Sequence, residues 1–588
     1  TCQNCKQSFS IEPDDFGFYE KMKVPPPTWC PWCRLQRRMN FRNSRVFYFS
    51  KTEDAKIPVF SYFHSNFEGA VYSRKYWFSG AWDGAEYGAT YDFTKPLFQQ
   101  FNELNYKVPF FANYNVSTEN SDYCGNVYDL KDCYLLFNGG FNESCCYGTE
   151  VLNCNNCFDG TNTGNCAYSL ELTDCTNCSG SAYCSNCQEC INVFFSENLI
   201  NCQDCIGCIN LRHKRYCIFN EHYSKESYAQ ALKDFDFGSS QTPQEIKTKF
   251  TQFRLRHLFK FMHGVKNLGV TGDYISNSKN CRECFASRDI ENCAHSQFVL
   301  FGNSHDSQDI SFAVGELCYE VQGNAGYQNK FVWDSATGDL GGGNPNLTYC
   351  MRCFDSHDLF ACIGLHNKSY CILNKQYTKE EYEKLVPRVI QHMNDMPYVD
   401  KKGRIYKYGE FFPPELSPFA YNETIAQEYF PLTKEEAESK GYTWKDPDTK
   451  EYTVSIQSKD LQDHIKDIQD SILQETIGCE HQSTCNEQCS TAFRIIPQEL
   501  QFYRKMNLPL PRLCPNCRHY QRLKQRNPLK LWHRNCQCVG SKSSNSVYTN
   551  TISHQHGSGP CPNEFETSYA PERPEIVYCE SCYSGEVV

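Results

Sequence analysis

The sequence predicts a mainly β fold with helical caps, in which two cysteine-rich β-solenoids lie between small cysteine-knuckle modules. Three observations predict this fold. Cysteines recur at intervals of 21 residues through the middle of the chain, and small or apolar residues recur there at every third position. Paired cysteines near the start are repeated near the end. At 588 residues the chain is too long for one hydrophobic core, so we expect several domains.

Composition excludes some classes of protein. The chain carries 58 Lys and Arg against 69 Asp and Glu, a formal charge of −11. A protein that coats nucleic acid along its whole length would be basic, so any such contact must be local. No apolar run approaches the roughly 20 residues of a membrane span, which predicts no membrane association.

The 38 cysteines would suit a disulfide scaffold in a short secreted protein. Their frequent C-x-x-C spacing instead favours metal-binding thiolates and a reducing, cytoplasmic location. The chain opens Thr1-Cys2 without Met, so we expect residues upstream, and a cleaved signal peptide stays open.

The first module has two cysteine knuckles, and the second repeats them. The pairs are Cys2-x-x-Cys5 with Cys30-x-x-Cys33, and Cys485-x-x-x-Cys489 with Cys514-x-x-Cys517. In both modules 25 positions separate the second cysteine from the third. Tetrahedral zinc takes four soft ligands, which two such knuckles supply. The sequence therefore predicts two zinc ribbons.

A third, degenerate copy follows. Cys561 precedes a phenylalanine as Cys5 and Cys489 do, and Cys579-x-x-Cys582 is its second knuckle. The position of the first ligand holds Gly557 or Ser558. We expect Cys538 or Cys536 to supply the fourth ligand, with His554 or His556 as substitutes, and about three zinc ions per chain.

Further residues of the modules carry a resemblance. Phe18-Tyr19-x-Lys21 matches Phe502-Tyr503-x-Lys505, and arginine follows both second knuckles, at Arg34 and Arg518. This pattern resembles the "probable zinc-ribbon" family, over about a fifth of the chain. The resemblance implies metal binding and no defined activity. As a whole the chain is similar to a group of large cysteine-rich bacterial proteins with ribbons at each end, which implies no function.

The middle of the chain repeats. One column consists of Cys124, Cys145, Cys166, Cys187 and Cys208, each 21 residues from the next. A fixed period with aligned apolar columns is typical of a solenoid, so we expect about five 21-residue coils stacked some 4.8 Å apart. Inward candidates recur every three residues, as in Cys187, Cys190, Val193, Ser196, Leu199, Cys202, Cys205 and Cys208. This spacing predicts short strand segments with a corner at each step. Cysteine would pack there as a small hydrophobe.

A second, looser solenoid is expected over about 268–374, because the phrase at 215–220 recurs at 369–374. A helix should follow each copy and cap the open end, starting at Ser224 and at the capping box of Thr378 and Glu381. Segments 241–264 and 458–476 are also expected to be helical. The aromatic segment before the first solenoid suggests a small core or a cap on the first coil.

The expected domains are therefore the following: 1–45 zinc ribbon 1, 46–114 aromatic-rich segment, 115–223 β-solenoid 1, 224–267 helical cap, 268–377 β-solenoid 2, 378–397 helical cap, 398–478 connector and helix, 479–534 zinc ribbon 2, and 535–588 zinc ribbon 3.

Basic residues beside the ribbons provide the clearest indication of function. Those predicted to contact nucleic acid are Arg34, Arg37, Arg38, Arg518, Arg522, Lys524, Arg526 and Trp532. Arginine beside aromatics suits phosphate contact and base stacking on RNA or single strands. The competing interpretation is that these arginines pair with carboxylates or cap knuckle carbonyls. The basic segment around Lys247 to Lys260 could likewise be an interaction helix or pack on its own domain.

We therefore predict a non-enzymatic, zinc-binding scaffold that contacts RNA, single-stranded nucleic acid or a ribonucleoprotein. The alternative is a structural or self-assembling protein with ribbons as folding staples. No catalytic motif stands out, although Asp83 and Asp92 invite a sugar-cleaving interpretation. The inward thiols could bind metal or an iron–sulfur cluster, or form an unmetallated ladder. The oligomeric state stays open.

Overall fold

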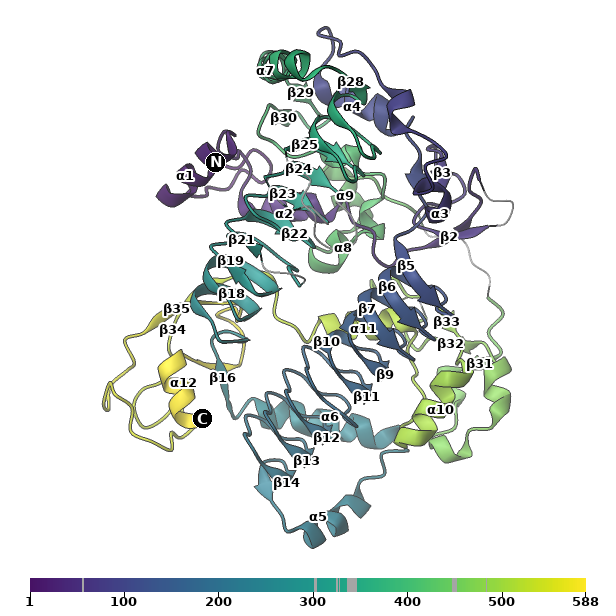
Figure 1. The fold of residues 1–588 in the computed structure, drawn as a ribbon. Helices are drawn as coiled ribbons and strands as arrows, with labels where there is room; N and C mark the ends of the chain where they lie inside the picture. The colour runs from purple at the N-terminus through teal and green to yellow at the C-terminus, as the bar shows by residue number, and fades with distance from the viewer. Residues whose placement is uncertain are drawn as a thin grey trace. The chain divides into compact units, whose positions relative to one another are not determined.

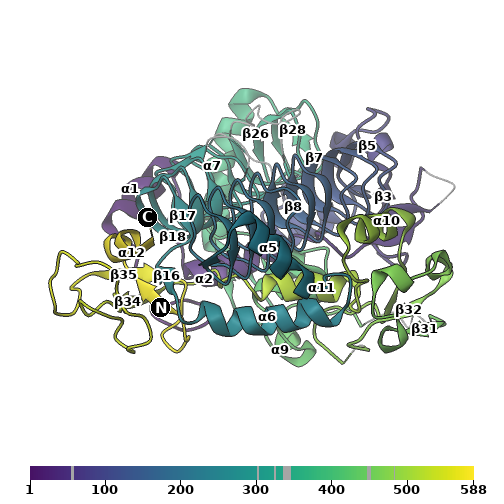
Figure 2. The same ribbon diagram turned by 90° about the horizontal axis from the view of Figure 1, so that it is seen from below.

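The computed structural model describes residues 1–587 apart from 55–57, 301–303, 324–325, 327, 336–345, 447–451 and 483. The mainly β fold with cysteine-rich solenoids is confirmed: short strands lie side by side, coil after coil (Figures 1 and 2). The chain divides into two compact units. Unit 1 contains Thr1–Tyr114 and Gly264–Asp446, and unit 2 contains Asn115–His263 and Pro447–Val588. Each unit is thus built from two separate stretches of chain.

Solenoid 1 belongs to unit 2, and its coils are 12 residues long. Asn115 pairs with Val127, and Val127 pairs with Gly139, all in parallel. Later, Gln203 pairs with Arg215 across the same step. The expected 21-residue coil is therefore wrong. Both 12 and 21 are multiples of the three-residue corner spacing, so a cysteine column at 21 stays on the inner face without marking one coil.

The strands of solenoid 1 are short. They are β5 Asn115–Glu119, β6 Gly125–Lys131, β7 Phe137–Glu143, β8 Thr149–Leu152, β9 Asn155–Phe158, β10 Thr161–Gly164, β11 Ala167–Leu170, β12 Ile191–Phe194, β13 Gln203–Ile206, β14 Arg215–Ile218 and β15 Glu221–His222. Isolated parallel bridges such as Thr173 to Ser185 continue the same step between β11 and β12.

Corners at every third residue make so short a coil possible. Asn153, Asn156, Asp159 and Asn162 have φ values of 53°, 52°, 55° and 52°. This left-handed region is costly for most side chains, but Asn and Asp tolerate it. Asparagine ladders add support outside the coil, since Asn162 Nδ2 donates to Asp174 Oδ1 at 2.6 Å, 12 residues on.

The inward positions form a thiol-lined core. The expected three-residue series from Cys187 to Cys208 is buried throughout, which confirms that prediction. Each inward thiol reaches backbone carbonyls: Cys184 Sγ, for example, donates to the oxygens of Ala182 and Val193 at 3.3 and 3.2 Å. Cysteine therefore fills the narrow interior and satisfies its own weak donor.

Solenoid 2 belongs to unit 1 and is less regular, as expected. The pairing step is 11 residues from Tyr319 to Lys330, but 18 from Lys330 to Thr348. Its strands are β17 Gly264–Val265, β18 Leu268–Ser276, β19 Lys279–Arg288, β20 Ile290–Glu291, β21 Ser304–His305, β22 Gln308–Ser311, β23 Tyr319–Gln322, β24 Lys330–Trp333, β25 Leu347–Met351, β26 His357–Phe360, β27 Ser369–Ile372 and β28 Lys375–Gln376.

Both solenoids end in the same hairpin. β14 pairs antiparallel with β15, and β27 with β28, across two-residue turns whose residues all have positive φ. That conformation is the one type I′ hairpins require. The turn asparagine reaches back in both: Asn220 accepts from the Ile209 amide at 2.9 Å, and Asn374 from the Ile363 amide at 2.8 Å. The duplicated phrase thus encodes a terminator that closes the open sheet edge.

Helices follow both hairpins. α5 (Lys225–Ala231) begins at Ser224, and α7 (Lys379–Asp395) has the expected capping box of Thr378 and Glu381. α6 (Gln241–Arg254) is shorter than expected, because β16 (Leu258–Lys260) follows it. The helix expected over 458–476 is wrong. That segment contains only the 3₁₀ turns η5 Ser458–Asp460, η6 Ile465–Asp467 and η7 Asp470–Gln474.

The aromatic segment covers solenoid 2 within unit 1. Trp77 packs edge-on against Phe354 at 5.6 Å between ring centroids, and against His366 at 4.6 Å. Its elements are β1 Tyr48–Ser50, β2 Val59–Ser61, β3 Val71–Tyr72, α3 Arg74–Trp77, η1 Gly84–Tyr87, α4 Leu97–Asn105 and β4 Phe110–Phe111. The segment shares one core with the outer face of solenoid 2.

The remaining elements complete the two units. In unit 1 these are α1 Pro13–Met22, α2 Pro31–Met39, β29 Tyr398–Val399, β30 Ile405–Tyr406, η3 Pro414–Leu416, η4 Tyr421–Glu423, α8 Ile425–Tyr429 and α9 Lys434–Ser439. In unit 2 they are η2 Leu232–Asp234, β31 Ile456–Gln457, β32 Ile477–Gly478, β33 Ala492–Phe493, α10 Pro497–Met506, α11 Pro515–Leu523, β34 Trp532–Asn535, β35 Glu564–Thr567, β36 Ile576–Tyr578 and α12 Glu580–Val587. Among the described helices, none has the length and apolar character needed to cross a bilayer.

Candidate metal centres

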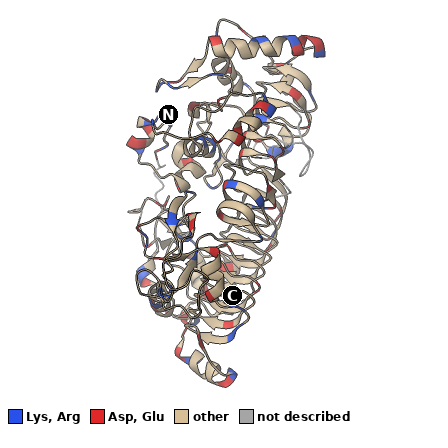
Figure 3. Cartoon of the chain, turned by 90° about the vertical axis from the view of Figure 1, so that its left-hand side faces the viewer, with Lys and Arg blue, Asp and Glu red and all other residues tan. Residues whose placement is uncertain are grey.

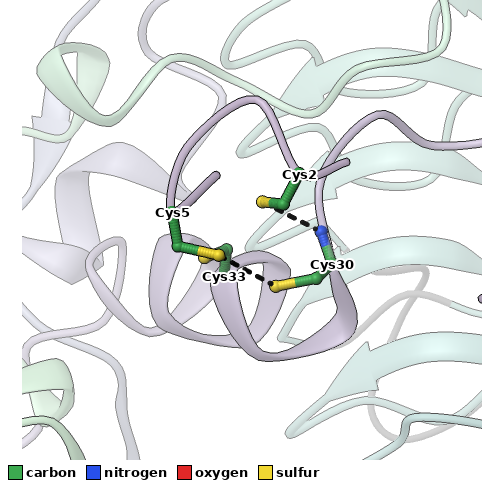
Figure 4. Close-up of side chains that lie close together, drawn as sticks. All are labelled: Cys2, Cys5, Cys30 and Cys33. Carbon is green, nitrogen blue, oxygen red and sulfur yellow. Dashed lines mark hydrogen bonds between the residues drawn. The ribbon is translucent and has the colours of Figure 1, made fainter. Parts of the chain in front are cut away.

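Four cysteines meet in each end module. Cluster 1 consists of Cys2, Cys5, Cys30 and Cys33, all predicted, and Figure 4 shows their sulfurs turned toward one another. Cluster 2 consists of Cys479, Cys489, Cys514 and Cys517, and cluster 3 of Cys536, Cys561, Cys579 and Cys582. Within each cluster the ligand atoms all lie within 4.8 Å of one another. Each cluster could therefore hold a metal ion.

Two of the predicted ligands, Cys485 and Cys538, are not members of these four-cysteine clusters. In cluster 2 the structure places Cys479 where the sequence predicts Cys485, which instead lies with His481, Glu487 and Cys517. In cluster 3 it places Cys536 rather than Cys538. Cys538 lies with His554, His556 and Cys582, so the four-cysteine set uses the alternative donor that the sequence left open.

One hydrogen bond shows that the three clusters are built alike. The amide of Cys30 donates to Cys2 Sγ at 3.3 Å. At the same 3.3 Å distance, the amide of Cys514 donates to Cys479 Sγ, and the amide of Cys579 to Cys536 Sγ. Cys2, Cys479 and Cys536 are therefore equivalent first ligands, and they precede the second knuckle by 28, 35 and 43 residues.

This shift explains why sequence analysis missed Cys479. Insertions before the second ligand moved the first cysteine out of the C-x-x-C spacing, while the 25-residue interval to the second knuckle stayed fixed. One signal remained in the sequence. Cys479 lies outside the ranges predicted for both solenoids, 115–223 and 268–377, and therefore needs another role.

The sulfur–sulfur distances fit tetrahedral coordination. A tetrahedron with metal–sulfur bonds of about 2.3 Å has edges of about 3.8 Å. Cys5 and Cys30 Sγ lie 3.8 Å apart, Cys514 and Cys489 Sγ 3.9 Å, and Cys561 and Cys582 Sγ 3.7 Å. The geometry of all three clusters thus suits a thiolate-bound tetrahedral ion.

Local hydrogen bonds favour thiolate at the equivalent third ligand. The Cys33 side chain lowers the pKa of Cys30 to about 5, and the Cys536 side chain lowers that of Cys579 to about 3. The Cys479 side chain lowers the pKa of Cys514 well below its usual value. Metal binding needs deprotonated cysteine, and in each cluster the third ligand is the one that its surroundings hold as a thiolate.

The second knuckle also starts a helix. Cys30 is the N-cap of α2 with Pro31 at its first position, and Cys514 and Pro515 have the same places in α11. Proline suits that position because its missing amide proton has no helical partner there. The cysteine N-cap and the proline after it therefore tie the start of the helix that carries the predicted arginines to the cysteine cluster.

In unit 1 those arginines point into solenoid 2. Arg34 and Arg38 both contact Asp309, at 2.8 Å each. Arg37 contacts Glu320 at 2.6 Å and Glu410 at 3.2 Å. The three arginine side chains are at most 2% exposed. They are therefore internal ion-pair partners rather than surface cations.

Unit 2 repeats the arrangement on solenoid 1. Arg518 and Arg522 both contact Asp159, at 3.1 and 2.9 Å, and Arg526 contacts Asp174 at 3.0 Å. Their side chains are buried as well. Position for position, Arg34 corresponds to Arg518 and Arg38 to Arg522, one and five residues after the second knuckle.

Lys524 and Trp532 lie differently. The Lys524 side chain is 65% exposed and pairs with Glu487. Trp532 is half-buried in β34, with the Lys530 ammonium 5.0 Å from its ring centroid. Figure 3 shows Lys and Arg interspersed with Asp and Glu rather than gathered in one stripe. The structure does not bring the predicted nucleic-acid residues together on one accessible face.

Solenoid thiols are arranged otherwise than those of the clusters. Within the described part of the chain, the groups of converging metal-ligand side chains all lie in the end modules. Inward cysteines such as Cys175 instead direct Sγ to carbonyl oxygens, here those of Thr173 and Cys184 at 3.4 and 3.5 Å. None of the described cysteines forms a disulfide bond.

Comparison with known proteins adds no relative: no family model, curated protein or solved structure matches the chain. The cysteine clusters at both ends could hold metal ions. No family model assigns the chain to the zinc-ribbon family that its cysteine pattern resembles.

Proposed function

We propose that this chain is a zinc-stabilised structural scaffold, in which the knuckle modules of clusters 1 and 2 each clamp an arginine helix into a solenoid. Zinc is the proposed ion because four thiolates in a closed tetrahedral set are its usual structural site. Its role here would be to fix the start of α2 and α11, with no open coordination position for chemistry.

One observation supports the clamp above all. In both units a single buried aspartate of a solenoid corner, Asp309 or Asp159, receives two arginines from one turn of the knuckle helix. Both aspartates have positive φ, 52° and 55°, which their residue type tolerates. Two knuckle modules and two solenoids thus use the same joint.

The burial of this joint weighs against a role for these arginines in nucleic-acid contact. A guanidinium that reached a phosphate would have to leave its carboxylate, and a charge left buried without its partner costs about 3–5 kcal/mol. Nucleic-acid binding would then depend on residues that reach solvent, such as the exposed Lys524 and the half-buried Trp532. We therefore favour the scaffold and leave nucleic-acid contact to a direct test.

Zinc content and chelation test the proposal. Purified full-length protein should contain at least one zinc per cluster, hence three or more per chain. Removing the metal with a chelator should lower the thermal midpoint of both units, because metal binding and folding are coupled in such modules.

Cys33→Ser should lose one zinc and destabilise unit 1 but not unit 2, and Cys517→Ser should do the reverse. Serine at a solenoid thiol such as Cys187 should leave the zinc content unchanged. A metal-free protein of undiminished stability would contradict the proposal.

A further inference from the structure

Module 3 contains a second group of ligand side chains beside cluster 3. Cys538, His554, His556 and Cys582 offer ligand atoms that all lie within 4.8 Å of one another, and only His556 is not fully buried. Cluster 3 uses Cys582 and none of the other three. Cys538, His554 and His556 therefore have no role in the four-cysteine site, although they adjoin it.

We propose that these four side chains form a second zinc site, which shares the Cys582 thiolate with cluster 3. The proposal rests on zinc in cluster 3 and extends it to a two-metal centre. Two cysteines and two histidines are an established structural zinc set. Cys582 Sγ lies 3.7 Å from Cys561 Sγ on one side and 3.5 Å from His556 Nε2 on the other. A thiolate sulfur keeps lone pairs beyond its first metal bond, so it can bridge two ions.

The hydrogen bonds of His556 leave the correct nitrogen for a metal. Its Nδ1 lies 2.9 Å from the carbonyl oxygen of Gly559. A carbonyl only accepts, so Nδ1 carries the proton and Nε2 presents its lone pair. That same Nε2 faces Cys582. Ligating histidines commonly donate their other ring proton to a carbonyl in this way.

His554 is oriented by a carboxylate. Its Nε2 lies 3.0 Å from Glu586 Oε1, and both side chains are almost fully buried. The ring proton then belongs to Nε2, and Nδ1 is left for the metal, which gives a carboxylate–histidine–metal arrangement. Glu586 is itself fixed, because Oε2 accepts from the amide and the hydroxyl of Thr551 at 2.8 and 2.7 Å.

Cluster 1 shows what the equivalent position looks like without a second site. There Asn4 Nδ2 donates to Cys33 Sγ at 3.3 Å, and no histidine adjoins it among the described residues. In cluster 2, Cys485 and His481 lie beside Cys517, but the carboxylate of that group, Glu487, also pairs with Lys524. Of the three modules, module 3 is therefore the one for which we propose a second site.

Metal counting on untagged full-length protein tests the site. His556→Gln and Cys538→Ser should each lose at least one zinc per chain relative to the natural sequence. His533→Gln is the matched control, since that histidine is 59% exposed and pairs with Glu564 and Glu566. It should lose none. Unchanged zinc in both site variants would overturn the proposal.

X-ray absorption at the zinc edge of the unmutated protein tests the second site even if a variant fails to fold. Sulfur together with nitrogen neighbours is expected, and purely sulfur ligation would overturn the second site while leaving the proposed scaffold intact. Complete absence of zinc would contradict the scaffold instead. Glu586→Gln should weaken the second site by about 10–100-fold in chelator competition, because it removes the carboxylate that orients His554.

Discussion

Arg522 and Asp159 form a buried ion pair of 2.9 Å, and their side chains are 1% and 0% exposed. Arg38 and Asp309 repeat it at 2.8 Å in the other unit. In each case a second arginine, four residues earlier, shares the same carboxylate. The internal duplication of this chain therefore includes the joint between knuckle module and solenoid, in addition to the cysteines.

Removing the shared carboxylate should destabilise its unit. Asp309→Asn leaves Arg34 and Arg38 buried without their charge partner, so the free energy of unfolding of unit 1 should fall by about 3–5 kcal/mol. Every tryptophan except Trp532 lies in unit 1, so urea unfolding followed by tryptophan fluorescence reports on it.

Asp446→Asn is the control for this substitution. It breaks the exposed Lys434–Asp446 pair of the same unit, whose aspartate is 70% exposed. Such a pair contributes about 0–1 kcal/mol. Equal effects of the two substitutions would contradict the proposed clamp.

Unit 1 should lose stability in acid through Asp309. Burial alone would raise the pKa of Asp309, but Arg34 and Arg38 outweigh it and hold the pKa at about 2. The unfolded value is about 3.9. A depressed folded pKa contributes stability that is complete above the unfolded value and is lost as pH falls toward 2. The thermal midpoint of unit 1 should therefore fall between about pH 4 and 2, and less steeply in Asp309→Asn. Parallel pH profiles would show that another group is responsible.

The solenoid interior should accept apolar side chains and reject charge. Cys166 is buried, and its Sγ lies against the carbonyls of Gly164 and Cys175, at 3.3 and 3.7 Å. Cys166→Val should change the free energy of unfolding by less than about 1.5 kcal/mol. Cys166→Asp should prevent stable folding or bind a proton, because a buried carboxylate has no cation there. Circular dichroism during heating measures both, and equal midpoints would place this column at the surface.

Stability should depend on the shape rather than the polarity of the side chain substituted at a corner position. Asn165 is exposed and has φ of 53°. Asn165→Val should destabilise unit 2 by roughly 1–2 kcal/mol, because a branched side chain disfavours this backbone conformation. Asn165→Asp and Asn165→Gly should be tolerated. The thermal midpoints of the three variants give the comparison. An unchanged midpoint in Asn165→Val would contradict the left-handed backbone conformation of this corner.

Binding to single-stranded nucleic acid provides the remaining test. If the scaffold alone is correct, full-length protein should show no affinity that falls steeply with salt. If single strands do bind, Lys524→Ala and Trp532→Ala should weaken binding, whereas Asp309→Asn should not. Fluorescence anisotropy at two salt concentrations separates these outcomes. Steep salt dependence would revive the nucleic-acid interpretation.

Much of the fold could be predicted because the inward positions repeat every three residues. The cysteine columns could not reveal the coil length, because 21 and 12 are both multiples of three. A coil of either length would bury the same positions. A better signal lay in the corners. Asn153, Asn156, Asp159, Asn162 and Asn165 recur every third position, and their backbone preference indicates where the chain must turn.

The cysteine clusters could be predicted where the first two ligands keep the C-x-x-C spacing. They could not be predicted where a longer loop separates these two ligands. Cluster 1 follows directly from its knuckles, whereas Cys479 and Cys536 were displaced by insertions. The arginines illustrate a different limit. Sequence shows a basic run beside an aromatic, but Asp159 and Asp174, which neutralise Arg522 and Arg526, lie more than 300 positions away along the chain.

The 12-residue pairing step also governs how such a chain can change in length. Inserting or deleting one whole coil in solenoid 1 keeps each remaining side chain on its inward or outward face and keeps the corners and both ends. The solenoid could therefore lengthen or shorten in steps of one coil. The 18-residue step between Lys330 and Thr348 shows that extra residues can instead leave the coil and return without breaking the stack. The length of the solenoid can therefore change by whole coils without altering the cysteine clusters at the ends of the chain.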